Sequence, residues 1–453
     1  MADTESTLPP LVLDWVAAHG EGDITRLERH VARREAWVVD VTSQSGAVLE
    51  GFLRIDRTPR VSDHISLRRE AAICQSLRPL GIPVPALLAW NEEHHVALFS
   101  REPGRADIDA LQDAQQQRRV MENFIDIIAR IHQLDEGELG LNAELGARPA
   151  TAAECALDDV DRQLQKFGGF LLQSPDPLTS YAVQWLRRHA PDQVSRISLV
   201  QGDTGPVNFM FEGDKVTAVV DWEWGHWGDP MEDLGNICVR EFWNPSGGLK
   251  GLFQRYEQVS GIPYNRFSAQ YYRIQQNVRG MIPIHVACHY MPPGQSLAWY
   301  LCYRYVGDRA TCEALADAID IAIERPEFPI EKPASNMAKA IAGYLQDDIE
   351  PKLEDKFARS RATDVSILAE CMERVHRYGD ELRAIECEEI SRLLGSTVTD
   401  YPRAISALNT AIEAEQLDDE SVIRYLARRA YRDEWLYWPV TRLYPDRHWS
   451  ALD

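Results

Sequence analysis

A predicted β-hairpin with polar residues at both ends is the feature that most constrains this chain. The runs 207–211 and 216–221 are rich in β-branched and apolar residues, and the four residues EGDK separate them. A Gly-Asp centre is typical of tight hairpin loops, so we expect the Glu and Lys of EGDK to pair and Asn208 to face Val219. In that register Asn208 and Asp221 share one face of the sheet, roughly 7–8 Å apart on a diagonal.

Asp203 lies just before this hairpin, in the turn-rich sequence QGDTGP. In phosphoryl transfer a protein mainly positions groups and neutralises charge, while one carboxylate orients or deprotonates the acceptor hydroxyl. Carboxylate and amide oxygens also suit magnesium, which binds its ligands at about 2.1 Å. Taken singly, Asp203 could simply cap a turn and Asp221 could begin a loop. The three together match the kinase order of catalytic Asp, metal-binding Asn208 and metal-binding Asp221.

The next two acidic residues are interpreted as structural. Asp229 precedes a proline at the start of a predicted helix, where a carboxylate caps the first turn and complements the helix dipole. We expect Asp229 and Asp233 to brace the loop that carries Asp221.

Composition excludes some function classes. The chain has 453 residues, and its 48 Lys and Arg against 70 Asp and Glu give a formal charge of 48 − 70 = −22. Nucleic-acid binding needs a basic face, so it is not expected, although a local basic pocket is compatible with this balance. The eight cysteines form no C-x-x-C pair. Together with the absence of a signal peptide or an apolar run of about 20 residues, this predicts a cytoplasmic protein without a membrane span.

Three regions separate along the sequence. Residues 1–105 combine β-like runs (37–43, 48–56 and 95–100) with one helical run, SLRREAAICQSLRPL, and predict an N-terminal nucleotide-binding lobe. Residues 106–325 are mostly helical and carry the catalytic and metal-binding loops. A proline-rich linker is predicted near 324–335, and residues 336–453 show helical periodicity throughout. The expected fold is α+β and two-lobed, a small mixed β lobe and a larger helical lobe, with an extra C-terminal helical domain.

The motif sequences resemble a known family. QGDTGPVNFMF followed by VTAVVDWEWGHWGDPMEDL is similar to the signature of the aminoglycoside phosphotransferase and choline kinase family, whose fold is protein-kinase-like. The resemblance covers roughly residues 20–300. Its nearest branch is that of hydroxyacyl-CoA kinases and the kinase-like domain of acyl-CoA dehydrogenases. EEISRLLG and the helical sequence after it resemble, more loosely, a small helical domain found beside this branch.

The resemblance also implies a nucleotide site. Arg54 in GFLRID occupies the strand position of the family's phosphate-binding Lys or Arg. Glu70, in the helical run RREAAICQSL, corresponds to the acid that pairs with it. Ser100, Arg101 and Glu102, in LFSREPG, correspond to the hinge whose backbone receives the adenine. By themselves, Arg54 and Glu70 would be interpreted as an ordinary surface pair.

Three positions depart from the family pattern. Gln201 stands where the family usually has His, and Gln can replace its hydrogen bonds but not its charge. Val31 and Ala32 stand where glycines would let backbone N–H groups approach phosphate, which leaves the two arginines that follow to assist. Arg54 replaces the commoner Lys with a wider, forked side chain.

The sequence therefore predicts a phosphotransferase that uses ATP and Mg²⁺ on a hydroxyl of a small molecule. The resemblance favours a hydroxyacyl-CoA-like thioester as the acceptor. Two alternatives stay open: an aminoglycoside or other amino-alcohol kinase, and a nucleotide-binding pseudokinase or regulatory scaffold, for which Val31, Ala32 and Gln201 speak. The expected partner is a small molecule with a hydroxyl group, which could be linked to CoA. Binding to nucleic acid or to a membrane is not expected. The sequence is also compatible with a homodimer.

Overall fold

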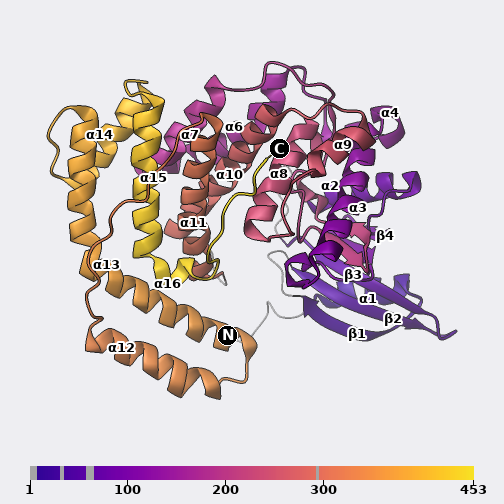
Figure 1. The fold of residues 1–453 in the computed structure, drawn as a ribbon. Helices are drawn as coiled ribbons and strands as arrows, with labels where there is room; N and C mark the ends of the chain where they lie inside the picture. Colours follow the sequence, from indigo (N-terminus) through magenta and orange to yellow (C-terminus); the bar gives the residue numbers. More distant parts are fainter. Residues whose placement is uncertain (1–7, 31–34, 58–65, 292–294, 453) are drawn as a thin grey trace. The chain divides into compact units, whose positions relative to one another are not determined.

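The computed structural model describes residues 8–30, 35–57, 66–291 and 295–452 (Figure 1). The chain forms two compact units. Unit 1 comprises residues 1–151, 193–266 and 450–453, and unit 2 comprises residues 152–192 and 267–449. The division into the regions 1–105, 106–325 and 336–453, which assigns a function to each region, stays a prediction.

Unit 1 begins with an antiparallel sheet of five strands in the order β1-β2-β3-β5-β4. Its core consists of alternate apolar side chains such as Val39, Leu53 and Leu98, and helix α1 packs Val12 and Val16 against them. The β-like runs of the sequence are confirmed as β2, β3 and β5, whereas α1, β1 and β4 were not predicted individually. The bounds are α1 Pro10–His19, β1 Gly22–His30, β2 Ala36–Ser43, β3 Val48–Ile55, β4 Leu87–Asn91 and β5 Val96–Ser100.

The predicted helical run of this lobe is confirmed as α2, Leu67–Leu77. Ser66 caps its N-terminus, because its side-chain oxygen accepts a hydrogen bond from the Arg69 N–H at 3.2 Å. A short 3₁₀ turn follows at Arg78–Leu80, and Gly81 ends it with φ 74°, a left-handed conformation that glycine adopts without a steric penalty.

The rest of unit 1 is mainly helical. α3 buries the apolar residues predicted from its periodicity, Val120, Phe124, Ile127, Ile128 and Ile131. Between the helices lie the short sheet β6-β9 and the hairpin β7-β8. The bounds are η2 Ile108–Ala110, α3 Ala114–Gln133, α4 Glu136–Leu139, α5 Asn142–Leu145, β6 Ser198–Val200, β7 Phe209–Glu212, β8 Lys215–Val219, η3 Trp222–Trp224, β9 His226–Gly228, α8 Pro230–Trp243 and α9 Leu252–Ser260.

The hairpin forms where it was predicted, but its register differs. Glu212 pairs with Lys215 as expected, whereas Phe209, not Asn208, lies opposite Val219. The register shifts between Met210 and Phe211, which leaves one extra residue in β8, and a bulge of this kind cannot be read from loop length alone. The predicted pairing of Asn208 with Val219 is therefore wrong. Asn208 precedes β7, and its C=O accepts a hydrogen bond from the Val220 N–H at 3.0 Å.

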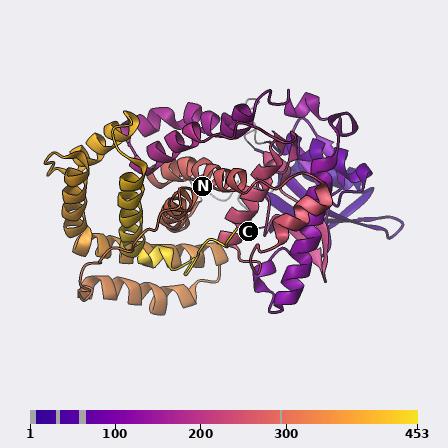
Figure 2. The ribbon, with the colours of Figure 1, turned by 45° about the horizontal axis from the view of Figure 1, so that its top comes forward.

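Unit 2 consists of helices in the described part of the chain. α15 packs against α11 and α13, as the yellow and orange helices of Figures 1 and 2 show. Residues 321–335 contain no helix or strand, as the predicted linker requires. The bounds are α6 Ala152–Gln173, α7 Pro177–Arg188, α10 Arg266–His289, α11 Leu297–Ala318, α12 Asn336–Gly343, a π-helical turn Tyr344–Ile349, η5 Glu350–Lys352, α13 Lys356–Leu394, α14 Tyr401–Glu413, α15 Asp419–Leu436 and α16 Trp438–Thr441.

None of the helices in the described part of the chain is both long and apolar enough to span a lipid bilayer.

Candidate active site

The predicted catalytic loop in unit 1 links Asp203 to Asn208. The Asn208 Nδ2 donates to the Asp203 carbonyl oxygen at 2.6 Å, and Asn208 is buried. Val207, between them, has φ 71°, an outlier for a β-branched residue. Such backbone strain persists only where surrounding contacts over-determine it, and it is concentrated at functional sites.

Gln201 supplies contacts that hold this loop against the hairpin end. Its buried amide donates to the carbonyl oxygens of Val220 at 3.0 Å and Asp221 at 2.8 Å. Its Oε1 accepts from the Asp203 N–H at 2.8 Å and from the Thr204 hydroxyl at 3.1 Å. Gln201 therefore both donates and accepts hydrogen bonds, as a histidine at this position would, but it carries no charge.

Asp233, near the start of α8, braces the loop that carries Asp203 rather than the one that carries Asp221. It accepts hydrogen bonds from the N–H groups of Gln201 and Gly202, each at 2.9 Å, and from the Thr204 hydroxyl. The Nε2 of His132 lies 3.0 Å from Asp233 Oδ2, the oxygen that also accepts from the Gln201 N–H. Burial alone would raise the pKa of Asp233, but these hydrogen bonds outweigh burial and lower it. The expectation for Asp233 was wrong about which loop it holds. The predicted N-cap role of Asp229 is confirmed, since it accepts from the Met231 N–H at 2.9 Å.

Arg54 joins three acidic residues from separate segments. It extends from β3, the central strand of the sheet, and its Nη1 lies 2.6 and 2.5 Å from the two carboxylate oxygens of Glu70. The same Nη1 lies 3.4 Å from Asp221 Oδ1, and Nη2 lies 3.5 Å from Glu223 Oε2. Burial disfavours the charge of Arg54, but the three carboxylates outweigh it and raise the pKa of the guanidinium. The predicted Arg54–Glu70 pair thus forms, and it reaches Asp221.

Asp221 itself has a backbone suited to a fixed role. It follows β8 in the left-handed region with φ 61° and ψ 57°, which Asp tolerates better than most residues. Its side chain is 35% exposed, although its neighbours Glu70 and Glu223 are nearly buried. The carboxylate of Asp221 is therefore accessible to a ligand from solvent while Arg54 and Gln201 hold its position.

The predicted hinge follows β5. The N–H of Ser100 donates to the Ala86 carbonyl at 2.8 Å, and the N–H of Arg101 donates to the Glu50 carbonyl at 3.1 Å. Glu102 accepts from the Ser100 hydroxyl at 2.5 Å. Because the first two N–H groups already have partners, an adenine would be left with the backbone of Glu102 and the carbonyl groups. Adenine binding by Ser100, Arg101 and Glu102 stays a prediction. The glycine-poor loop with Val31 and Ala32 lies outside the described residues.

Arg240 is the main site residue that sequence analysis missed. Extending from α8, it donates from Nε to Asp203 Oδ1 at 2.9 Å, and its Nη2 contacts Asp203 Oδ2. This bidentate pair fixes the plane of the carboxylate. A sequence signal existed, because Asp233 and Arg240 are seven residues apart and lie on one helix face. Both contact the catalytic loop.

The residues present fit a magnesium ion by their chemistry. Asn208 and Asp221 offer amide and carboxylate oxygens, the hard ligands that magnesium selects. The hydrogen bond from Asn208 Nδ2 to the loop orients its amide oxygen, and Asp221 keeps an accessible carboxylate.

Comparison with known proteins agrees with this geometry. Residues 24–268, more than half of the chain, match the model of the family described as "Phosphotransferase enzyme family". The chain belongs to this family. Membership of this family is what the resemblance of the sequence motifs predicted.

A solved structure and two curated proteins illustrate the relationship. The structure of a Ralstonia eutropha protein assigned to the aminoglycoside phosphotransferases aligns with a TM-score of 0.52 and 19% identity, over 67% of this chain and 94% of that one. This likeness confirms the kinase-like α+β fold. Acyl-CoA dehydrogenase family member 10 of Mus musculus is 29% identical over 234 residues, which are 48% of this chain and 21% of that protein. Family member 11 of Rattus norvegicus is 25% identical over 43% of this chain and 26% of its own length. The predicted resemblance is confirmed, and the chain spans about a quarter of the length of these relatives.

Proposed function

We propose that unit 1 transfers the γ-phosphoryl group of ATP, with Mg²⁺, to a hydroxyl group of a small molecule. The observation that carries the proposal is the Arg54 guanidinium, which contacts both Glu70 and Asp221. It joins the predicted phosphate-binding pair to a predicted metal ligand. The catalytic loop is tied to the same place through Gln201, which bonds to the backbone of Asp203 and Asp221.

Each residue has a definite task in this mechanism. Arg54, held by Glu70, binds phosphate oxygens. Asn208 and Asp221 would hold magnesium, which when bound neutralises the charge of the phosphates. Asp203 orients the acceptor hydroxyl and accepts its proton while that oxygen bonds to the γ-phosphorus and the bond from this phosphorus to ADP breaks. The proton then leaves Asp203 for solvent.

For the acceptor we propose a hydroxyacyl-CoA-like thioester. The support is that the curated relatives are named as acyl-CoA dehydrogenase family members and that their sequences align with about half of this chain. We also propose that the protein is located in the cytoplasm. That it forms a homodimer stays a prediction from the sequence.

The test is an ADP-release assay with the full chain, Mg-ATP and three acceptor groups: hydroxyacyl-CoAs, aminoglycosides and choline-like alcohols. We expect release that requires a hydroxyacyl-CoA and disappears in Asp203→Asn. Asp214→Asn is a matched control, since Asp214 lies in the exposed hairpin loop and pairs with Arg119. It should retain the activity of the unmodified chain.

The other outcomes each contradict a part of the proposal. Turnover with aminoglycosides or amino alcohols alone would keep the phosphotransferase and reject the thioester acceptor. Tight ATP binding without turnover on any acceptor would reject both kinase assignments and leave the nucleotide-binding scaffold. Equal activity of Asp203→Asn and the unmodified chain would reject the assigned role of Asp203.

A further inference from the structure

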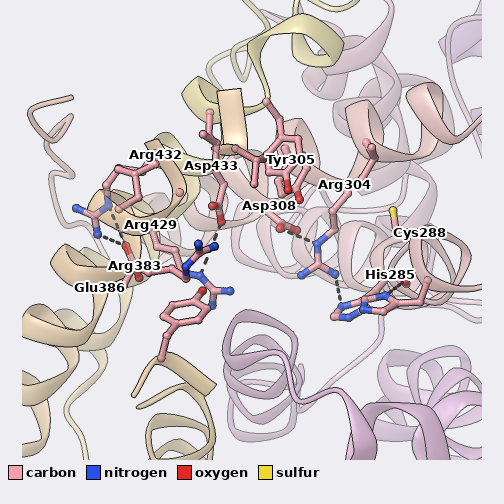
Figure 3. A pocket seen from close by; sticks show the side chains of 18 residues that line it. His285, Cys288, Arg304, Tyr305, Asp308, Arg383, Glu386, Arg429, Arg432 and Asp433 are labelled. Atoms are coloured by element: carbon pink, nitrogen blue, oxygen red, sulfur yellow. Dashed lines mark hydrogen bonds and ion pairs between the residues drawn. The ribbon is translucent and has the colours of Figure 1, made fainter. Parts of the chain in front are cut away.

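Unit 2 contains a cavity that the phosphotransferase site does not use. It holds about 280 Å³ and is lined by side chains from α10, α11, α13, α14 and α15 and by the residue after α15 (Figure 3). Liquid water occupies about 30 Å³ per molecule, so the space suits a ligand of roughly ten non-hydrogen atoms. No residue predicted to bind nucleotide, magnesium or acceptor is among those that line it.

Two of the arginines in this cavity already have full sets of partners. Arg304 contacts Asp176 and Asp308, each at 2.8 Å, and also the His285 ring. Arg432 donates to Glu386 from Nε at 2.8 Å and to Glu389 at 2.6 Å. These arginines act as fixed structural cations rather than as free sites for an anion.

The carboxylates of the cavity are less well satisfied. Asp308 is 5% exposed, and its Oδ1 is buried with no hydrogen-bond partner among the described residues. Asp433 is paired only at long range, because its Oδ2 lies 3.8 Å from Arg429 Nε. Its side chain is 31% exposed although it lines this cavity. In Figure 3 the two carboxylates are drawn between Arg429 on one side and Arg304 on the other.

One donor complements these acceptors. The Nε of Arg429 is buried and has no hydrogen-bond partner in the part of the chain that the structure describes. Aromatic surface is also present, since the rings of Tyr305 and Tyr437 stack with centroids 4.0 Å apart and both line the cavity. The cavity thus offers unfilled carboxylate oxygens, one unfilled N–H and the faces of aromatic rings.

We propose that this cavity is a binding site for a small molecule that carries a protonated amine. Asp308 and Asp433 accept hydrogen bonds from the ammonium group, and the ring of Tyr305, which lines the same cavity, provides a cation–π contact. A hydroxyl or carboxylate oxygen elsewhere on the ligand accepts from Arg429 Nε. A simple anion is disfavoured because it would face both carboxylates, while the three lining arginines other than Arg429, namely Arg304, Arg383 and Arg432, are already paired with carboxylates.

Three small molecules of similar size test the charge preference. Ethanolamine presents an ammonium and a hydroxyl group, ethylene glycol replaces the ammonium by a hydroxyl, and glycolate replaces the aminomethyl group by a carboxylate. Calorimetric titration of the full chain at about pH 8, where carboxyl groups are ionised and ethanolamine is still protonated, should show ethanolamine binding at least tenfold more tightly than either analogue. Equal affinities, or tighter binding of glycolate, would overturn the proposal.

Variants then locate the binding. Asp308→Asn keeps the shape of the side chain but not its charge, and it should weaken ethanolamine binding at least tenfold. Gly379→Leu fills the cavity from α13, where an added Cβ would meet the flexible end of Arg383 first, 3.2 Å away. It should abolish binding while the protein stays folded. Glu381→Gln is the control, because Glu381 lies on the same helix outside the lining and pairs with Lys332, which does not line the cavity either.

The results separate this site from the phosphotransferase centre. Ethanolamine binding that survives both Asp308→Asn and Gly379→Leu would take place elsewhere on the chain and would refute the cavity site. Loss of binding in both variants, with unaltered binding in Glu381→Gln, would support it. Neither result depends on turnover, so the proposal stands or falls independently of the proposed function.

Discussion

Replacing Gln201 by leucine should loosen the catalytic loop by a predictable amount. The buried amide of Gln201 makes hydrogen bonds to Val220, Asp221, Asp203 and Thr204. Leucine occupies a similar volume but forms none of them. Thr204 keeps a second partner, so three backbone groups lose theirs. A buried polar group left without a partner costs about 1–3 kcal/mol, and water can reach the half-exposed hairpin end, so we expect about 2–4 kcal/mol in total.

A histidine at the same position provides an internal calibration. A neutral imidazole has one donor and one acceptor, so Gln201→His can keep two of the four hydrogen bonds. Its cost should be roughly half that of the leucine variant, about 1–2 kcal/mol. The order of stability should therefore be glutamine, histidine, leucine.

Hydrogen–deuterium exchange of the segment 199–222 measures this locally and does not require the whole chain to unfold in one step. Since each 1.4 kcal/mol is a factor of ten, Gln201→Leu should accelerate exchange there by about 30- to 1000-fold. Gln112→Leu is the control, because Gln112 is exposed and makes one hydrogen bond at 3.4 Å. If Gln201→Leu changes exchange by no more than the control, the loop does not depend on this side chain and the argument is refuted.

Three further outcomes follow from the structure. Arg240→Met should lower kcat about 10- to 100-fold because Asp203 loses its bidentate partner, whereas the KM for ATP should hardly change in ADP-release kinetics. Arg54→Met should destabilise unit 1 by about 3–5 kcal/mol in urea unfolding, since it removes a cation that contacts the buried carboxylates of Glu70 and Glu223, and Arg54→Lys should be milder. Burial raises the pKa of Asp308 from 3.8 to about 7 despite Arg304. The folded chain then keeps a proton that the unfolded chain releases, so stability from this group is complete below about pH 4 and is lost as the pH rises through about 7. The fall in unfolding midpoint between about pH 5.5 and about pH 8 should be smaller in Asp308→Asn.

The sequence was most informative where short-range pattern and chemistry coincide. The helix α2 lies within the helical run predicted from the local sequence, because helix signals act within a few residues. The Arg54–Glu70 pair forms as the family resemblance implied. The sequence did not separate β1 from its surroundings, since most of its side chains are exposed and show no regular alternation.

The hairpin register failed for a physical reason. Loop length fixes the pairs nearest the turn, and Glu212 indeed lies opposite Lys215. The bulge beyond them depends on contacts from other segments. The Val219 N–H donates to the Pro83 carbonyl at 2.8 Å, and Phe211 exchanges hydrogen bonds with Arg105 at 2.9 and 3.0 Å. No pattern within the hairpin encodes these partners, so the shift could not be deduced from it.

The same reasoning explains why the support of the catalytic loop was not predicted, since Asp233 was assigned to the loop of Asp221 and Arg240 was not singled out. Asp233 and Arg240 belong to one face of α8. Asp233 accepts from the Gln201 N–H and Arg240 donates to Asp203, so both contact the catalytic loop. In the sequence, the acidic residues at the start of α8 indicate a helix cap, and Arg240 resembles an ordinary basic residue near a helix C-terminus. Only the fold brings that face against the loop. The carboxylate motif therefore predicts which residue accepts a proton. The arginine that fixes this carboxylate can be found only by helix spacing, counted from a residue already known to contact the loop. If Arg240→Met leaves kcat unaltered while Asp203→Asn abolishes it, helix spacing has identified a structural contact rather than a positioning residue.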